Sequence, residues 1–389
     1  MQNRRKFIKT GLLTFTGAGL AGRFYLPDRL LSGKEEDKFI YRTLGRTGIR
    51  LPAVSLGTNN TNNPALIRSA LEKGVKLLAT ARAYQNGNNE KMIGTVIKGL
   101  PRDTYLILTN SFDISWIDTK TGIMNSAFSY DKLLKGARSS LSALGVEYVD
   151  IFLQPFTATR ESVFNEPAMK AMEALKKEGI TRFIGIATHR SEPEAVRAAT
   201  DSGIYDVILT SYNFLKTNRE ELDDAISYAV KAGLGIIAMK TMAGAYWDKE
   251  RTRPINSRAA LKWVLRNENI HTSVPDCGDF SQLNQNLELM SDIRLTEQEL
   301  KDLIPPPEGP VSGLYCQQCG ECLPQCPHGV DIPTLMRGYM YAFGYHNFAQ
   351  AKITITNAGL KGVQCSGCET CRVNCKMGFD IRKKILDVT

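Results

Sequence analysis

Eight cysteines near the C-terminus form two runs with the same internal spacing. The two runs are Cys316, Cys319, Cys322, Cys326 and Cys365, Cys368, Cys371, Cys375. Each reads C-x2-C-x2-C-x3-C. Thiolates are ligands for metal ions and for iron–sulfur clusters, and paired thiols can also oxidise to disulfides. The repeated spacing indicates that the eight cysteines share one role, which is metal binding, cluster binding or disulfide formation.

Three chemistries compete for these thiols. Cysteines that build a disulfide framework are usually scattered, so that they tie distant loops together. Zinc sites usually pair two Cys-x-x-Cys or Cys/His arms across a gap. Three cysteines in a tight CxxCxxC loop instead wrap one [4Fe–4S] cube, and the fourth, often followed by Pro, reaches the second cluster of a two-cluster ferredoxin. The first run ends in Cys326-Pro327, whereas the second ends in Cys375-Lys376.

We therefore predict two [4Fe–4S] clusters, each held by three cysteines of one run and the last cysteine of the other. The predicted ligand sets are Cys316, Cys319, Cys322 with Cys375, and Cys365, Cys368, Cys371 with Cys326. The ninth cysteine, Cys277, is predicted to be a packed thiol. The predicted tail domain, 310–389, resembles a bacterial-type dicluster ferredoxin.

The charge of the chain does not indicate a nucleic-acid-binding protein. The formal net charge is +9, but two clusters with four thiolates each would bring it to about +5, because each carries roughly −2. Part of the remainder lies within the first ten residues, and no basic stripe interleaved with aromatic residues appears. The composition of 43% hydrophobic residues allows a sizeable core.

The N-terminus resembles an export signal. Residues 3–9 read NRRKFIK, and a mild apolar run follows at 11–22 that is too short for a membrane span. The pattern resembles a twin-arginine signal over 1–33; the alternative is a basic start before a loose helix. Clusters are built on folded protein, which the twin-arginine route exports. We therefore predict a periplasmic protein, either free or anchored by its signal.

The region between the N-terminal segment and the cysteine runs must position the residues of any active site. Eight short apolar runs alternate with amphipathic stretches, at 53–58, 75–81, 104–110, 148–154, 182–188, 205–211, 235–241 and 270–276. Continuous apolar runs are typical of parallel strands covered on both faces. Eight such units over 38–303 predict a (β/α)8 TIM barrel. A doubly wound sheet is the alternative, but no GxGxxG follows the first strand. Residues 39–58 predict a hairpin leading into that strand.

Several stretches of this region resemble aldo/keto reductases. They are YRTLGRTGIRLPAVSLGT, ATARAYQNGNNEKMIG, LGVEYVDIFL and ALKWVLRNENIHTSVPDCGDFSQLNQNL, and the resemblance spans most of 39–303. A barrel with a dicluster tail and a twin-arginine start is similar to an iron–sulfur branch of that family. The resemblance implies an oxidoreductase that reduces carbonyls with NADP(H), using Tyr as proton donor tuned by Lys and Asp, with His orienting the carbonyl.

The expected catalytic set is largely replaced in this chain. Tyr84 matches the tyrosine, but Ala79 stands where the family has Asp. Asn110 stands at the lysine position, and the histidine position falls on Pro155 or, with a shift of one residue, on Gln154. Ordinary ketone reduction is therefore not what the sequence predicts.

The contacts expected for NADP(H) are weakened as well. The Ser-Asn pair of the family is Thr188-His189 here, and the glycine that opens the phosphate loop is Asp276, whose carboxylate would repel a phosphate. Asn286 is retained. The candidate cofactor-binding residues are therefore Thr188 and Asn286, and the nicotinamide cofactor itself is in doubt.

Three residues are candidates for catalysis at the predicted barrel mouth. Tyr84, Lys240 and His189 each follow the end of a predicted strand, where the active sites of such barrels lie. Each also has a purely structural interpretation, as a hydrogen-bonded wall residue, an ion-paired lysine or a packed imidazole. A long loop at 113–130 could cover a ligand.

Three functions remain open from the sequence. The first is an electron-transfer protein whose clusters exchange electrons with an unknown donor or acceptor protein, while the barrel binds a partner or a small organic ligand. The second is an active oxidoreductase on a carbonyl or polyol that uses Tyr84 with substitute residues. The third is a non-catalytic scaffold of an envelope complex, in which the clusters serve as structural staples.

Overall fold

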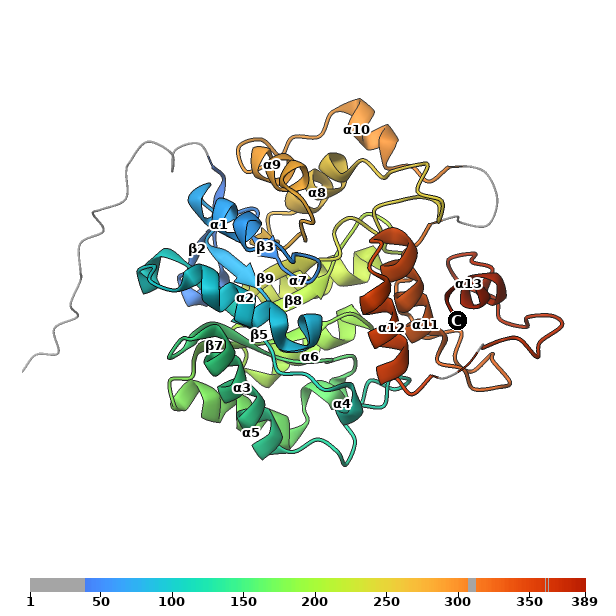
Figure 1. Ribbon diagram of the computed structural model, residues 1–389, viewed down its shortest axis with the longest axis horizontal. Coiled ribbons are helices and arrows are strands. Elements are labelled where there is room, and N and C mark those ends of the chain that lie inside the picture. The colour runs from blue at the N-terminus through green and yellow to red at the C-terminus, as the bar shows by residue number, and fades with distance from the viewer. Residues whose placement is uncertain (1–38, 307–312, 361, 363) are drawn as a thin grey trace, which may run out of the picture. The chain divides into compact units, whose positions relative to one another are not determined.

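The computed structural model describes residues 39–306, 313–360, 362 and 364–389. Its centre is a single sheet of eight parallel strands in which each strand pairs with the next along the chain (Figure 1). The strands are β3 Leu56–Gly57, β4 Leu77–Ala79, β5 Leu106–Thr109, β6 Val149–Gln154, β7 Thr181–Thr188, β8 Val207–Ser211, β9 Gly235–Met239 and β10 Thr272–Ser273. The eight predicted runs are confirmed as the eight strands of this sheet.

Isolated bridges bring the two edges of the sheet together. Val54 pairs with Ser273, and Gly57 pairs with Asp276, both in parallel. The amide of Ser55 donates to the carbonyl of Ser273 at 2.8 Å. The eight strands therefore form a nearly closed barrel, which confirms the predicted (β/α)8 fold.

The predicted hairpin closes the bottom of the barrel, where the strands begin. β1 Tyr41–Thr43 and β2 Arg50–Pro52 pair antiparallel. Leu44 and Leu51 of this hairpin are buried with the side chains that fill the barrel interior. A Cβ at Gly235 would meet the Leu44 side chain at 2.5 Å, so glycine lets the hairpin approach the first residue of β9.

Helices cover the outside of the barrel (Figure 1). They are α1 Pro64–Glu72, α2 Asn88–Ile97, α3 Tyr130–Leu144, α4 Arg160–Val163, α5 Glu166–Lys177, α6 Glu192–Ser202, α7 Arg219–Lys231, α8 Ser257–Leu265, α9 Phe280–Glu288 and α10 Glu297–Asp302. Local sequence sets several starts: the side chains of Asn63, Ser129 and Asn165 accept hydrogen bonds from amides of the first turn. Their apolar faces and the outer face of the sheet form one core, and a second core fills the barrel interior.

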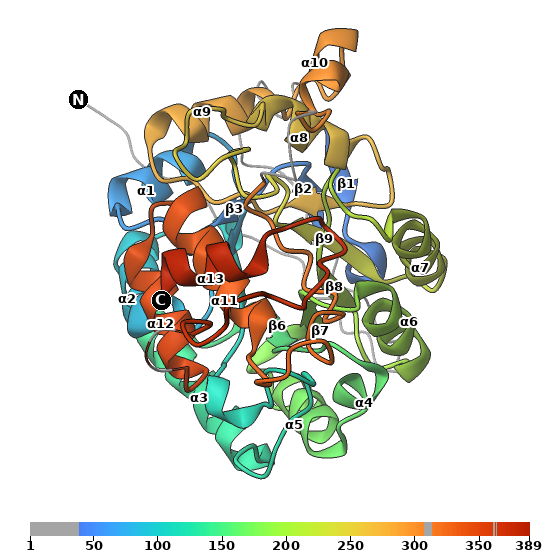
Figure 2. The same cartoon turned by 90° about the vertical axis from the view of Figure 1, so that its right-hand side faces the viewer.

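The tail after the barrel is built from short helices and the two cysteine runs. The helices are α11 Ile332–Tyr339, a π-helical turn Met340–Gly344, α12 Phe348–Asn357 and α13 Ile381–Val388. Met336, Phe379 and Ile385 belong to a small core of the tail, against which six of the eight cysteines pack. Figure 2 looks onto the face where α11, α12 and α13 lie over the barrel.

The tail and the barrel belong to one compact unit, Lys38–Thr389. The predicted boundary between them, at 303–310, stays a prediction. The predicted twin-arginine signal lies outside the described residues. Within the described part of the chain, no helix has both the length and the apolar character that a membrane span requires.

Candidate functional site

The structure groups the cysteines across the two runs. The pKa of the Cys316 thiol is raised to about 12, chiefly by burial and also by the neighbouring Cys319 and Cys375. The pKa of Cys322 is likewise raised, first by burial and then by neighbouring cysteines that include Cys375. The pKa of Cys365 is raised by burial and then by Cys368, Cys326 and Cys371. Each predicted set of four is thus a set of electrostatic neighbours, in which the last cysteine of one run joins the first three of the other.

The arrangement of these thiols fits an iron–sulfur cluster. Among the residues that the structure describes, no three His, Cys, Asp or Glu side chains converge closely enough to hold one metal ion. A [4Fe–4S] cube takes one thiolate per iron and keeps its thiolates apart. The apolar side chains of the small core surround the cysteines, as expected around a cluster shielded from water.

The loop of the first cysteine run is fastened to the barrel mouth. The hydroxyls of Tyr315 and Ser211, the last residue of β8, lie 2.7 Å apart. The side-chain amide of Gln317 donates to the Thr217 hydroxyl at 2.8 Å. A Cβ at Gly320 would lie 2.5 Å from the Arg190 guanidinium, so Arg190 packs directly on the loop. Barrel residues thus hold the loop that carries Cys316, Cys319 and Cys322.

A buried ion pair lies beneath this loop. Lys216 binds the Glu192 carboxylate, and both side chains are at most 1% exposed. Burial lowers the pKa of Lys216, but Tyr315 and Glu192 raise it by more, so the net direction is upward. Because a buried charge is costly without a partner, this pair fixes the β8–α7 loop in the position that receives the tail.

Tyr84, Lys240 and Asp276 gather at the carboxyl ends of β4, β9 and β10. The tail adds Tyr341 and Tyr345 above them. Lys240 Nζ donates to Tyr341 Oη at 3.3 Å and lies 4.9 Å from the centre of that ring. The backbone of Lys240 is left-handed, with φ 58°, and its carbonyl accepts from Asn213 at 3.0 Å. A lysine is rarely found at such a φ, which marks a constrained position at the mouth.

The acid–base properties of this group are strongly coupled. Burial raises the pKa of Asp276 to about 6, against the opposing effect of Lys240. Burial, Asp276 and Tyr341 raise the pKa of Tyr84, while Lys240 lowers it. Burial lowers the pKa of Lys240, but Tyr341 and Tyr345 raise it by more. At neutral pH the group therefore holds a protonated lysine, a neutral Tyr84 and a carboxylate that titrates close to neutrality.

The asparagine-rich loops form the floor of this group. The Asn59 amide donates to Asp276 Oδ1 at 2.9 Å, and Asn60 Nδ2 donates to Oδ2 at 3.3 Å. Asn347 of the tail donates to Asn60 Oδ1 at 2.8 Å. Asn89 ties this loop to the end of β4 through Thr58 and Thr80. Most of these amides are thus engaged within the protein.

The other predicted site residues lie apart from this group. Thr188 is buried and its hydroxyl donates to the Arg190 carbonyl at 3.0 Å. Asn286 is buried on α9 and donates to Cys277 Sγ at 3.3 Å, in the core where Cys277 was predicted to pack. His189 is half-buried beside Phe156, with ring centres 6.4 Å apart. Its pKa is lowered by burial and then by Lys240, Arg337 and Lys216.

Sequence reasoning missed what the tail adds to the mouth. Tyr341 and Tyr345 lie in the aromatic stretch YMYAFGY between the cysteine runs, which was the one signal available. Asp276 was considered only as a group that repels phosphate, whereas the structure makes it a partner of Tyr84 and Lys240. The close approach depends on glycine: a Cβ at Gly344 would lie 2.6 Å from the Gly244 carbonyl of the β9 loop.

Comparisons with known proteins agree with this architecture. A sequence model of the aldo/keto reductase family matches residues 53–259, and one of a 4Fe–4S dicluster domain matches 315–380. The chain is 24% identical over 285 residues to an uncharacterized oxidoreductase, YqkF, of Bacillus subtilis, covering 66% of this chain and 90% of that protein. It is 29% identical over 223 residues to L-galactose dehydrogenase of Arabidopsis thaliana, covering 53% and 66%.

Solved structures share the barrel. An aldo-keto reductase of Bacillus halodurans in its holo form aligns with a TM-score of 0.55 at 19% identity, covering 68% of this chain and 95% of that one. An aldo-keto reductase of Klebsiella pneumoniae in complex with NADPH aligns with a TM-score of 0.54 at 22% identity, covering 69% and 97%. The chain belongs to the aldo/keto reductase family and is an oxidoreductase-like member that carries a C-terminal 4Fe–4S dicluster domain.

Proposed function

We propose that this protein passes electrons through two [4Fe–4S] clusters and that the barrel mouth beneath the first cluster binds a partner or a small organic ligand. One observation carries the proposal. The loop with Cys316, Cys319 and Cys322 is fastened to the barrel through Tyr315 and Gln317, directly above the ends of the strands. A cluster that served only to stabilise the fold of the tail would not need these hydrogen bonds to the barrel.

The residues that would hold the clusters are the two crossed sets of cysteines. When bound, such clusters supply single-electron transfer. The chain contributes the surroundings: an apolar core around the thiols, and the Arg190 guanidinium packed on Gly320 between two ligands of the first set. A cation at that place favours the more negative, reduced form of a cluster, because net charge and surroundings set its reduction potential.

A second function, reduction of a carbonyl or oxidation of a polyol, is favoured by the group at the mouth. In this proposal Ala79, Asn110 and Pro155 have replaced the family's Asp, Lys and His, and Lys240 with Asp276 takes over their role. The reduction would consume two electrons, delivered through the clusters from a donor protein, and two protons. Tyr84 Oη would give one proton to the carbonyl oxygen, the second proton would come from solvent, and Asp276 would take part in reprotonating Tyr84 because its pKa lies near neutrality.

We also propose that the protein works in the cell envelope. The twin-arginine-like start supports export after folding, which a cluster-bearing protein requires. Its electron donor or acceptor would then be another protein of that compartment. A fusion of residues 1–40 to a reporter that is active only after folded export would test this: export lost when Arg4 and Arg5 are both changed to Lys supports the proposal.

A redox titration followed by electron paramagnetic resonance tests the main proposal. Anaerobically purified full-length protein should give cluster signals that appear on reduction and disappear reversibly on oxidation. Mixing the reduced, cluster-loaded protein with a carbonyl substrate separates the two functions. Oxidation of the clusters with formation of the alcohol favours the second. Clusters that cannot be cycled would leave only the role of a structural staple and would refute electron transfer.

A further inference from the structure

A cleft opens between the barrel and the loop of the first cysteine run. The space in the cleft and at its entrance, open solvent included, is at most about 450 Å³. The barrel side is formed by Ile117 and Gly122 of the long loop after β5, by residues 156–158 after β6, and by His189 and Arg190 after β7. The tail side is formed by Gln318, Pro333, Thr334 and Arg337. Gln318 stands between Cys316 and Cys319, so the cleft reaches the first cluster loop.

The described lining of the cleft is basic. It contains Arg190, Arg337 and His189 and no aspartate or glutamate. Arg190 is engaged with the carbonyls of Thr119 and Lys120, which fixes its position. Arg337 differs: among the described residues its guanidinium makes one long hydrogen bond, to Thr334 Oγ1 at 3.4 Å, and no ion pair with a carboxylate. Most of its donors are therefore available to a ligand.

The nearby carboxylate of the tail belongs to Asp331, which precedes α11. Its Oδ1 accepts from the Thr334 amide at 3.2 Å as the helix cap, whereas its Oδ2 is buried and has no hydrogen-bond partner among the described residues. Lys240, Arg337 and Lys216 all act on His189 and, with its burial, keep its pKa well below the usual value. The imidazole is then neutral at pH 7, so the positive charge in the cleft comes from the arginines.

One wall of the cleft is aromatic. Phe156 packs on Phe112 with ring centres 3.6 Å apart, and the Arg337 guanidinium lies 6.0 Å from the Phe156 ring. Phe156 has a left-handed backbone, with φ 53°, which a bulky side chain rarely adopts. The strained residue thus presents a flat apolar surface directly beside the arginine.

We propose that this cleft binds a small organic carboxylate, with its carboxylate on Arg337 and its flat apolar part against Phe156. A guanidinium binds a carboxylate through two parallel hydrogen bonds, which gives both charge and orientation. Even with its open part included, the cleft is too small for a dinucleotide, so only a compact acid could enter it. The inference rests on the proposed function, in which a small organic ligand occupies the mouth, and deepens it by naming the ligand's class.

Benzoate is a suitable probe because it combines a carboxylate with a flat ring. Isothermal titration calorimetry on the anaerobic, cluster-loaded full chain should show benzoate binding. Benzamide, which has the same shape without the charge, should bind at least about tenfold more weakly, since hydrogen bonds between charged groups contribute more than neutral ones. Inorganic phosphate should not displace benzoate, because it lacks the apolar part.

Variants locate the binding. Arg337→Gln should weaken benzoate binding about 10- to 100-fold, and Arg337→Lys should retain part of it. Arg68→Gln on α1, an exposed position with the same loss of charge, should leave it unchanged. Iron content and thermal unfolding show whether each variant is folded. The comparison of benzoate with benzamide needs no variant, so it decides even if Arg337→Gln does not fold.

Three results would overturn the inference: no benzoate binding, equal binding of benzamide, or unchanged affinity in a folded Arg337→Gln protein. The proposed electron transfer is judged separately, by the redox titration. Clusters that cycle in a protein that ignores benzoate would remove the carboxylate site and keep electron transfer. Benzoate binding by a protein whose clusters cannot be cycled would keep the carboxylate site and remove electron transfer.

Discussion

Two aspartates at opposite ends of the barrel have very different surroundings. Asp150, near the start of β6 at the bottom, is 0% exposed and accepts from Arg102 at 2.8 Å, Arg182 at 2.9 Å and the Ile107 amide at 2.8 Å. Asp276, after β10 at the mouth, accepts from the two asparagines Asn59 and Asn60. Among the described residues no arginine donates to it, and burial raises its pKa to about 6.

The difference separates stability from chemistry. At the bottom each oxygen of the Asp150 carboxylate pairs with an arginine, which links β6 to its neighbours. At the mouth Asp276, Lys240 and Tyr84 shift one another's pKa values through electrostatic interaction. Active sites of such barrels lie at the mouth, and conserved charge at the bottom serves the fold. Tyr341 and Tyr345 of the tail lie at the mouth.

The largest expected effect lies in the tail. Cys322→Ser removes one predicted ligand and should lower the iron content from about eight atoms per chain to about four, because one [4Fe–4S] cluster is lost. Metal analysis of anaerobically purified protein measures this directly. Cys277→Ser is the matched control: Cys277 lies buried in the barrel core, so its replacement should leave the iron content unchanged. Equal iron in both variants would contradict the ligand sets.

A smaller effect is expected at the bottom of the barrel. Asp150→Asn should lower the free energy of unfolding by about 2–3 kcal/mol, because Arg102 and Arg182 lose their buried partner. Urea unfolding followed by tryptophan fluorescence is suitable, since Trp116, Trp247 and Trp263 all lie in the barrel region. Glu166→Gln, which breaks only the exposed pair with Lys170, serves as the control and should not change stability measurably. Equal stability of Asp150→Asn and wild type would remove the contrast between the two ends.

The smallest effect concerns pH at the mouth. The pKa of Asp276 in the folded protein is about 6, above the usual 3.8, so the folded state binds one more proton than the unfolded state between these values. Stability should therefore fall as pH rises from about 4 to about 6, by about 1–2 kcal/mol from this group, because its partial exposure to solvent screens part of the effect. Asp276→Asn should flatten that part of the profile. If wild type instead gained stability relative to Asp276→Asn as the pH rose from about 4 to about 6, the raised pKa of Asp276 would be contradicted.

Much of the fold could be predicted because a barrel strand carries its signal locally. The runs at 148–154 and 182–188 are continuous in apolar residues, and the structure places β6 and β7 within one residue of them. The first and last strands are shorter than predicted. β10 covers only Thr272–Ser273, because Asp276 already turns toward the mouth and meets Gly57 through a single bridge.

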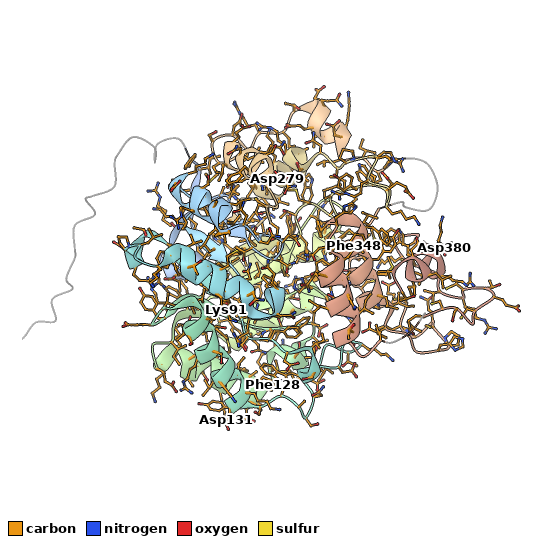
Figure 3. All side chains as sticks on the ribbon, viewed as in Figure 1. Lys91, Phe128, Asp131, Asp279, Phe348 and Asp380 are labelled. Atoms are coloured by element: carbon orange, nitrogen blue, oxygen red, sulfur yellow. The ribbon has the colours of Figure 1, made fainter. Side chains whose placement is uncertain are left out.

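The site was less predictable because its parts come from distant segments. Tyr84 and Lys240 could be placed together, since both follow strands of one barrel. Tyr341 and Arg337 could not, because no periodic pattern tells where a short tail helix will dock. The long loop at 113–130 was expected to cover a ligand. Within this loop Phe128, labelled in Figure 3, packs edge-on to Trp116 with ring centres 5.6 Å apart. Ile117 and Gly122 of that loop line the cleft.

The most direct test of the account is the metal content of the full-length protein purified without oxygen. Two [4Fe–4S] clusters on eight thiolates require about eight iron atoms and eight sulfides per chain, with no stoichiometric zinc. That result, together with reversible reduction of the clusters, is what the account predicts. A chain that holds zinc, or holds no metal and joins its cysteines as disulfides, would contradict it, because the loop on the barrel mouth would then carry no electrons.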